Sequence, residues 1–155
     1  MPDEVAAVEL LPGERRAAWA ITADGQPVVA TQAALLLPGG ARLEWRRVER
    51  ASWQPPCLTV LEVADLEGAG ARHVHELIDE GDLPAVVHSR VTASVAWTDH
   101  AKLSPTGGVR VVGRRVPDAE LLEWQLVYDA GTDREDPLVR AQAEQLVEQA
   151  RRSIG

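Results

Sequence analysis

The runs RAAWAIT (16–22), PVVATQAALLL (27–37), ARLEWRRVERASW (41–53) and CLTVLEV (57–63) carry the strongest pattern in this chain of 155 residues. Turn-forming residues separate them, namely ADGQ (23–26), PGG (38–40) and QPP (54–56). Short apolar runs bounded by glycine, proline and aspartate are typical of strands joined by tight turns. Residues 16–63 therefore predict an antiparallel meander of four strands.

Alternation within these runs predicts which face each side chain takes. Trp19 and Ile21 share parity, so we expect both to point into the core. Residues 28–37 are apolar almost throughout, which indicates a strand covered on both faces or a bulge near Gln32. The alternation slips again at Arg46 and Arg47, where a second bulge is expected.

The middle of the chain has a different character. Residues 71–90 predict a helical insert, with Asp82 near the N-cap and Pro84 in the first turn. Within it, residues 73–78 fit a helical turn or a strand equally well. Period-two alternation then predicts three more strands, at residues 91–98, 109–113 and 122–128.

Residues 134–154 predict a C-terminal amphipathic helix. Pro137 suits the first helical position, and Glu135 and Asp136 place negative charge at the helix start. Its apolar stripe consists of Val139, Ala143, Leu146, Val147, Ala150 and Ile154. A lone helix is marginal in water, so the stripe must pack on a sheet or a partner. With residues 1–14 as an N-terminal arm, we expect one domain over residues 1–155.

The composition is that of a globular chain, with 45% apolar residues, 26% charged residues and a net charge of −8. This charge repels nucleic acid and anionic membranes at long range, so no nucleic-acid partner is expected. A single cysteine excludes an intrachain disulfide. The N-terminus lacks the features of a signal peptide, and no apolar run approaches the roughly 20 residues of a membrane span. We therefore expect a cytoplasmic protein.

The predicted order is four strands, a helical insert, three strands and a helix. This order resembles the pleckstrin-homology (PH) superfold, and the local phrases resemble those of small PH-like domains from high-GC bacteria. The phrases are LPGER (11–15), AT (30–31) leading into ALL (34–36), and LEWRRV (43–48) followed by ASW (51–53). The resemblance implies an α+β split barrel of two antiparallel sheets, with the C-terminal helix closing one end.

The resemblance also bears on function. Lipid-binding PH domains carry basic residues in the first hairpin, whereas this chain has Asp24 and Gly25 there, so the resemblance argues against phosphoinositide binding. It implies a non-catalytic binding or scaffolding module for a protein partner or for self-association. No enzyme activity, cofactor or metal is expected.

The arginines suggest an alternative hypothesis for the function. They fall into two groups, Arg46, Arg47 and Arg50, and Arg110, Arg114 and Arg115. If the strands bring the groups together, they form a basic patch that binds an anion or a membrane surface. The competing interpretation is that they are charged residues at strand edges, where charge prevents unwanted pairing.

The histidines supply a third hypothesis, a metalloenzyme or small hydrolase. His73 and His75 would share a face of a strand, and a third metal ligand would have to come from Glu76, Asp79 or His88. His100 would need Asp99 with Ser94 or Ser104 to form a nucleophile and base. Neighbours on a strand point to opposite faces, so Asp99 is poorly placed to orient His100.

Overall fold

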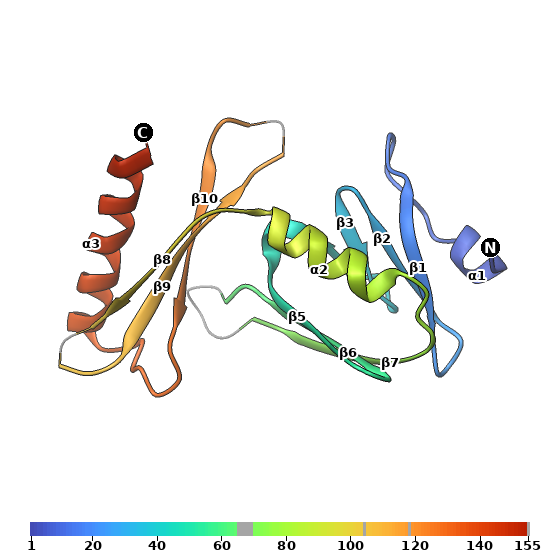
Figure 1. Ribbon diagram of the computed structural model, residues 1–155, viewed down its shortest axis with the longest axis horizontal. Helices are drawn as coiled ribbons and strands as arrows, with labels where there is room; N and C mark the ends of the chain where they lie inside the picture. The colour runs from blue at the N-terminus through green and yellow to red at the C-terminus, as the bar shows by residue number, and fades with distance from the viewer. Residues whose placement is uncertain (65–69, 104, 118, 155) are drawn as a thin grey trace. The chain divides into compact units, whose positions relative to one another are not determined.

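The computed structural model describes residues 1–64, 70–103, 105–117 and 119–154 (Figure 1). The chain forms two compact units, Met1–Ser94 and Val95–Gly155, whereas the sequence predicted one domain over residues 1–155. Its class is mixed α and β, with antiparallel sheets and a C-terminal helix, as predicted. The strand count differs, because the sheets hold seven and three strands where the prediction was four and three.

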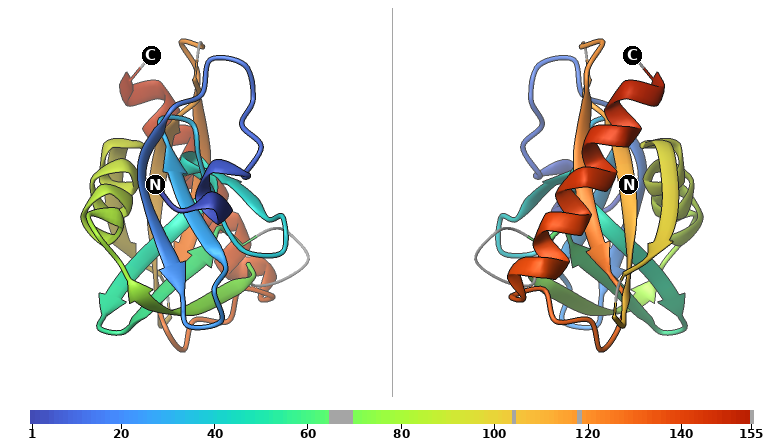
Figure 2. Two further views of the ribbon diagram at one scale, coloured as in Figure 1. Left: turned by 90° about the vertical axis from the view of Figure 1, so that its right-hand side faces the viewer. Right: turned by 90° about the vertical axis from the view of Figure 1, so that its left-hand side faces the viewer.

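The first unit is a seven-stranded antiparallel sheet with a helix on it. Its strands follow the order β4-β3-β2-β1-β7-β6-β5. In Figure 2, strands β1 to β3 cross strands β5 to β7 at a steep angle, with α2 beside them. Its elements are α1 (Asp3–Ala6), β1 (Arg16–Thr22), β2 (Pro27–Thr31), β3 (Ala34–Leu36), β4 (Arg42–Glu44), the 3-10 helix η1 (Trp45–Arg47), β5 (Val48–Gln54), β6 (Cys57–Glu62), β7 (Arg72–Asp79) and α2 (Leu83–Ala93).

Two of the four predicted strands are each broken in two. The hydroxyl of Thr31 accepts hydrogen bonds from the backbone N–H groups of Ala33 (3.1 Å) and Ala34 (3.0 Å), which turns the chain between β2 and β3. The 3-10 helix η1 separates β4 from β5 at the position where the alternation slips. Trp45 lies in η1, and its indole N–H donates to the carbonyl of Thr31 at 3.0 Å, so the two breaks are joined.

The predicted helical insert at residues 71–90 was wrong in its first half. Residues Arg72–Asp79 form strand β7, which pairs with β6 along Arg72–Glu76 and with β1 near Leu77. Strand β7 therefore lies between β1 and β6 in the sheet, next to the first and the last predicted strand of the meander. The helix α2 begins only at Leu83, after Asp82 at the N-cap, and it ends at Ala93.

Burial in β1 is the reverse of the prediction. Ala18 and Ala20 face the main core, whereas Trp19 and Ile21 pack on a second cluster that contains Val5 of α1. Both faces of β1 are covered by other residues. Ala18 and Ala20 can therefore be buried on one face while Trp19 and Ile21 pack on the other. Leu83 is fully buried in the main core, as α2 packs there.

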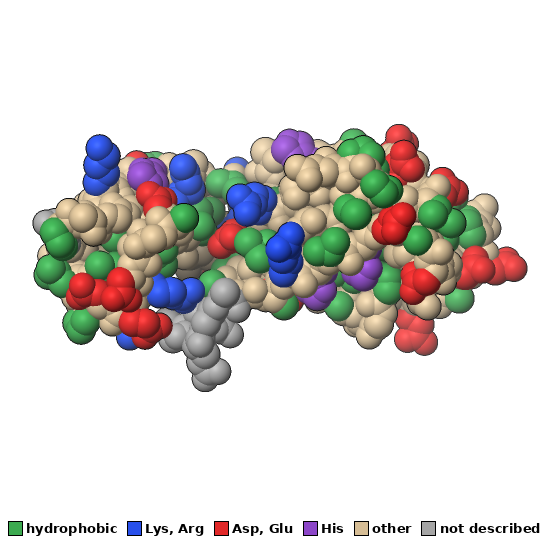
Figure 3. Space-filling model, turned by 90° about the horizontal axis from the view of Figure 1, so that it is seen from below, with side chains coloured by type: hydrophobic (Ala, Val, Ile, Leu, Met, Phe, Trp, Pro, Cys, Tyr) green, Lys and Arg blue, Asp and Glu red, His purple; other side chains and the backbone are tan. Residues whose placement is uncertain are grey.

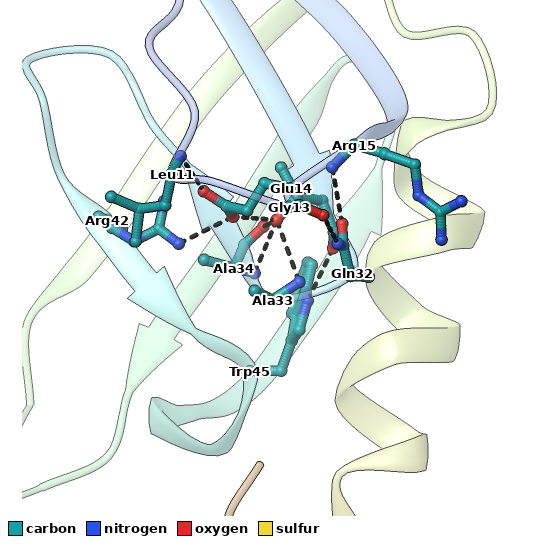
Figure 4. A network of polar contacts seen from close by, with 10 residues as sticks. Leu11, Gly13, Glu14, Arg15, Gln32, Ala33, Ala34, Arg42 and Trp45 are labelled. Atoms are coloured by element: carbon teal, nitrogen blue, oxygen red, sulfur yellow. Dashed lines mark hydrogen bonds and ion pairs between the residues drawn. The ribbon is translucent and has the colours of Figure 1, made fainter. Parts of the chain in front are cut away.

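A buried carboxylate ties the turn before β1 to the rest of the sheet (Figure 4). Glu14 accepts hydrogen bonds from the Leu11 N–H (2.7 Å) and the Thr31 hydroxyl (2.6 Å), and it forms an ion pair with Arg42 (2.8 Å). Its side chain is only 4% exposed. These contacts, with the hydrogen bond from Arg42 the largest cause, lower the pKa of Glu14 to about 2 despite its burial.

The second unit is a three-stranded antiparallel sheet with one long helix. It contains β8 (Val95–Lys102), β9 (Gly108–Arg115), β10 (Leu122–Tyr128) and α3 (Pro137–Ile154), in the strand order β10-β9-β8. Val139 and Ala143 of α3 are buried against Val109. The C-terminal helix is thus confirmed with its start at Pro137, while the side chain of Ile154 lies outside the described part. No helix within the described residues is long and apolar enough to cross a membrane.

Candidate functional site

Strand β5 lies at one edge of the seven-stranded sheet. Among the described strands its only neighbour is β6, with pairs from Val48↔Glu62 to Gln54↔Cys57. An edge strand presents backbone N–H and C=O groups along its open side. Strand β5 also packs against α2.

A hollow of about 450 Å³ lies between β5 and α2, and we call it the β5–α2 groove. Register explains part of its lining, because Ala51 and Trp53 face the same side of the sheet as the buried Leu58. The helix side is lined from the turn before α2 onward. The lining residues are Ala51, Ser52, Trp53, Leu58, Glu80, Gly81, Asp82, Pro84, Ala85, Val87 and His88.

The groove combines an apolar floor with a polar mouth. Leu58 and Val87 are buried, and Trp53 is partly buried beside them. Glu80 and Asp82 are exposed and put negative charge at the end where α2 begins. Such a site suits an apolar side chain next to a cationic one.

The first predicted arginine group is divided between two elements. Arg46 and Arg47 lie in η1, and Arg46 pairs with Glu44 at 2.8 Å. Arg50 is exposed on β5, on the face opposite Ala51. Its register partner is Leu61 of β6, which in turn pairs with Arg72 of β7, so the three residues form one cross-strand row.

The second arginine group is divided by the alternation of β9. Arg110 is exposed and donates to the Thr98 hydroxyl at 3.3 Å. Arg114 is only 3% exposed, and its Nε donates to Gln125 at 3.1 Å. Arg115 donates to the carbonyl of Val95 at 2.8 Å. The two groups belong to different units, so a single patch made of all six arginines stays a prediction.

His73 and His75 share one face of strand β7, as expected for a strand, whereas His88 and His100 lie on other elements. His73 contacts Glu62 at 2.8 Å, and burial, helped by the charge of His73, lowers the pKa of His75. His88 lies on α2 in the groove lining. Within the described residues, no three His, Cys, Asp or Glu side chains gather as metal ligands would.

Among the described residues, His100 contacts a residue that the sequence did not single out. Its Nε2 lies 2.7 Å from the carboxylate of Asp129. The Ser94 hydroxyl donates to the carbonyl of Val91 at 2.7 Å, and the predicted Ser104 lies outside the described residues. Both members of the His100–Asp129 pair are exposed, as in an ordinary polar contact at the surface.

Sequence reasoning missed the groove and the alignment of Arg72 with Arg50 across the sheet. The groove joins β5 to a helix that begins beyond the next two strands, and no local pattern reports such a neighbour. A signal for Arg72 did exist, because reading residues 72–79 as a strand places Arg72 on the face opposite His73. Comparison of the chain with protein-family models, curated proteins and solved structures found no match.

Proposed function

We propose that residues 1–94 form a PH-like binding module, and that the module binds an extended segment of a partner protein in the β5–α2 groove. The PH superfold consists of seven strands followed by a helix, and β1 to β7 followed by α2 supply that order within one unit. The resemblance is therefore assigned to this unit, with α2 in the place of the closing helix, and not to the whole chain.

The observation that carries the proposal is the edge strand β5 beside an apolar groove. An extended peptide can add to an open sheet edge through main-chain hydrogen bonds, while pockets for alternate side chains supply specificity. Here the edge offers the hydrogen bonds, and Trp53, Leu58 and Val87 offer the apolar pocket.

The lining also defines the kind of segment that fits. Alternate residues of an added strand would point into the groove, so apolar side chains are expected at every second position. Glu80 and Asp82 at the end of the groove favour a basic residue of the partner there. A second copy of the chain, pairing β5 with β5, is the alternative occupant, since an isolated edge can also pair with itself.

The test uses a peptide selected from a random displayed library as the probe. Ala85 is exposed and lines the groove, so A85W fills the groove without entering the core. Thr92 is exposed on the same helix outside the lining, so T92W is the matched control. We expect A85W to weaken peptide binding about tenfold or more, a loss of about 1.4 kcal/mol. Equal affinity of A85W and T92W, or amide shift changes that avoid β5 and α2, would refute the proposal.

A further inference from the structure

The outer face of β5, β6 and β7 carries a polar hollow that shares only Ser52 with the lining of the β5–α2 groove. Pairing aligns Arg50, Leu61 and Arg72 in one row across the three strands. The next row starts with Ser52 and Thr59. Side chains at alternate positions of paired strands share a face, so all five project from the same side of the sheet.

This face is the one opposite the core. Leu58 and Val60 of β6 are buried, whereas Arg50, Ser52 and Arg72 are exposed. Figure 3 shows one face of the molecule, with Lys and Arg side chains in blue and hydrophobic side chains in green. A ligand could therefore reach the two arginines from solvent without any opening of the fold.

A hollow of about 560 Å³ lies on this face, lined by Arg50, Ser52, Gln54, Thr59, Leu61 and Arg72. Two guanidinium groups, two hydroxyls and one amide thus surround an aliphatic floor, and none of the lining side chains is acidic. Neighbouring strands lie about 4.8 Å apart, so β5 and β7, the strands that carry Arg50 and Arg72, are roughly 10 Å apart at the backbone. Their long side chains can converge on an anion held over Leu61.

The lining of the hollow places no acidic side chain beside the two arginines. Within the described part of the chain, neither Arg50 nor Arg72 has an ion pair or a hydrogen bond through its side chain, whereas Arg42 pairs with Glu14 and Arg46 with Glu44. The chain has a net charge of −8, so two cations that share one hollow and have no ion pair among the described residues stand out from their surroundings. On the same face of β7, Glu76 lies in the row of Cys57, two rows from Arg72.

We propose that this hollow binds a phosphate group, as inorganic phosphate or a phosphomonoester. Guanidinium groups bind phosphate with charge-assisted, often bidentate hydrogen bonds, and hydroxyls add neutral donors. A phosphate offers oxygens to donors on both sides, which suits one arginine at each side of the floor. Leu61 would contact the organic part of a phosphomonoester.

Two sources could supply such a group, a free phosphorylated metabolite or a lipid headgroup. Val74 and Ile78 are 52% and 65% exposed, and they share the outer face of β7 with Arg72. Apolar side chains beside cations would let a headgroup bind with its bilayer nearby. The experiment therefore compares soluble phosphates with phosphate groups on vesicles to show which of the two sources the hollow binds.

The experiment titrates the full chain with inorganic phosphate and with glycerol phosphate, followed by NMR of the arginine Nε–H signals. In parallel, sedimentation is measured with phosphatidylcholine vesicles, with and without phosphatidic acid. The test variant is R50Q/R72Q. The control R15Q/R152Q makes the same change in net charge at exposed arginines outside the hollow.

We expect saturable binding that weakens with salt, about tenfold or more loss in R50Q/R72Q, and wild-type binding in the control. Binding of the soluble phosphates identifies a free ligand, and arginine-dependent binding to phosphatidic acid vesicles alone identifies a headgroup; either supports the proposal. No binding of any probe at low salt, or equal losses in the two double variants, would overturn it. A85W should leave phosphate binding unchanged, so failure of the groove proposal would be seen separately.

Discussion

Replacement of Glu14 by glutamine should destabilise the first unit strongly and change how its stability depends on pH. The carboxylate is nearly buried and is held by Arg42, Thr31 and the Leu11 N–H. Its pKa falls from 4.5 to about 2 in the folded chain. At about 1.36 kcal/mol per pKa unit, this corresponds to about 3 kcal/mol of stability at neutral pH.

The lowered pKa of Glu14 determines how stability changes with pH. The unfolded chain takes up a proton on Glu14 near pH 4.5, while the folded chain resists protonation until about pH 2. The contribution is therefore fully present above the unfolded pKa and is lost as the pH falls toward 2. E14Q removes the charge at every pH, so the stability difference between wild type and E14Q should be largest at neutral pH and should shrink below pH 4.5.

The assay is urea unfolding of wild type and E14Q at several pH values, followed by tryptophan fluorescence. E44Q is the control, because Glu44 also pairs with an arginine at 2.8 Å but its side chain is 47% exposed. An exposed pair contributes about 0–1 kcal/mol, so E44Q should change stability little. The reasoning is refuted if E14Q unfolds like E44Q at neutral pH, or if the difference between E14Q and wild type does not shrink in acid.

Two further changes test the packing of each unit. L83A should cost about 2–5 kcal/mol, because Leu83, the first residue of α2, is fully buried in the main core. L121A, at a side chain 76% exposed, should be nearly neutral, and unfolding measurements that rank the two alike would contradict the core assignment. G108A should separate His100 from Asp129, because a Cβ at Gly108 would lie 2.2 Å from the Asp129 carboxylate. A crystal structure of the variant with the pair intact would contradict this steric role.

Local chemistry was enough to predict much of the fold. Strand β1 matches the predicted run 16–22, since alternation and flanking turns act within a few residues. Pro137 begins α3, because proline is suited to the first turn. The breaks in the long runs were visible only as irregularities near Gln32 and Arg46, since the contacts that make them, such as Trp45 to Thr31, span distant positions.

Other features depended on tertiary contacts. Val91 and Ala93 alternate like strand residues, yet they end α2, whose Leu83 and Val87 are held in the core. Helix α2 has little amphipathic pattern of its own, so its packing overrides the local signal. The groove and the hollow on the outer face each join residues from separate elements, and the alignment of Arg50 with Arg72 across Leu61 needs the register of three strands.

Hydrogen exchange of the β5 amides, measured with and without the selected peptide, tests strand addition most directly. Main-chain pairing would protect amides on the open edge of β5 (Val48–Gln54), while those of β4 (Arg42–Glu44), the opposite edge of the same sheet, serve as the internal reference. We expect the β5 amides to exchange more slowly when the peptide is bound, and the β4 amides to exchange at the same rate with and without it. Protection confined to β4, or peptide binding with unchanged exchange in β5, would contradict strand addition at β5.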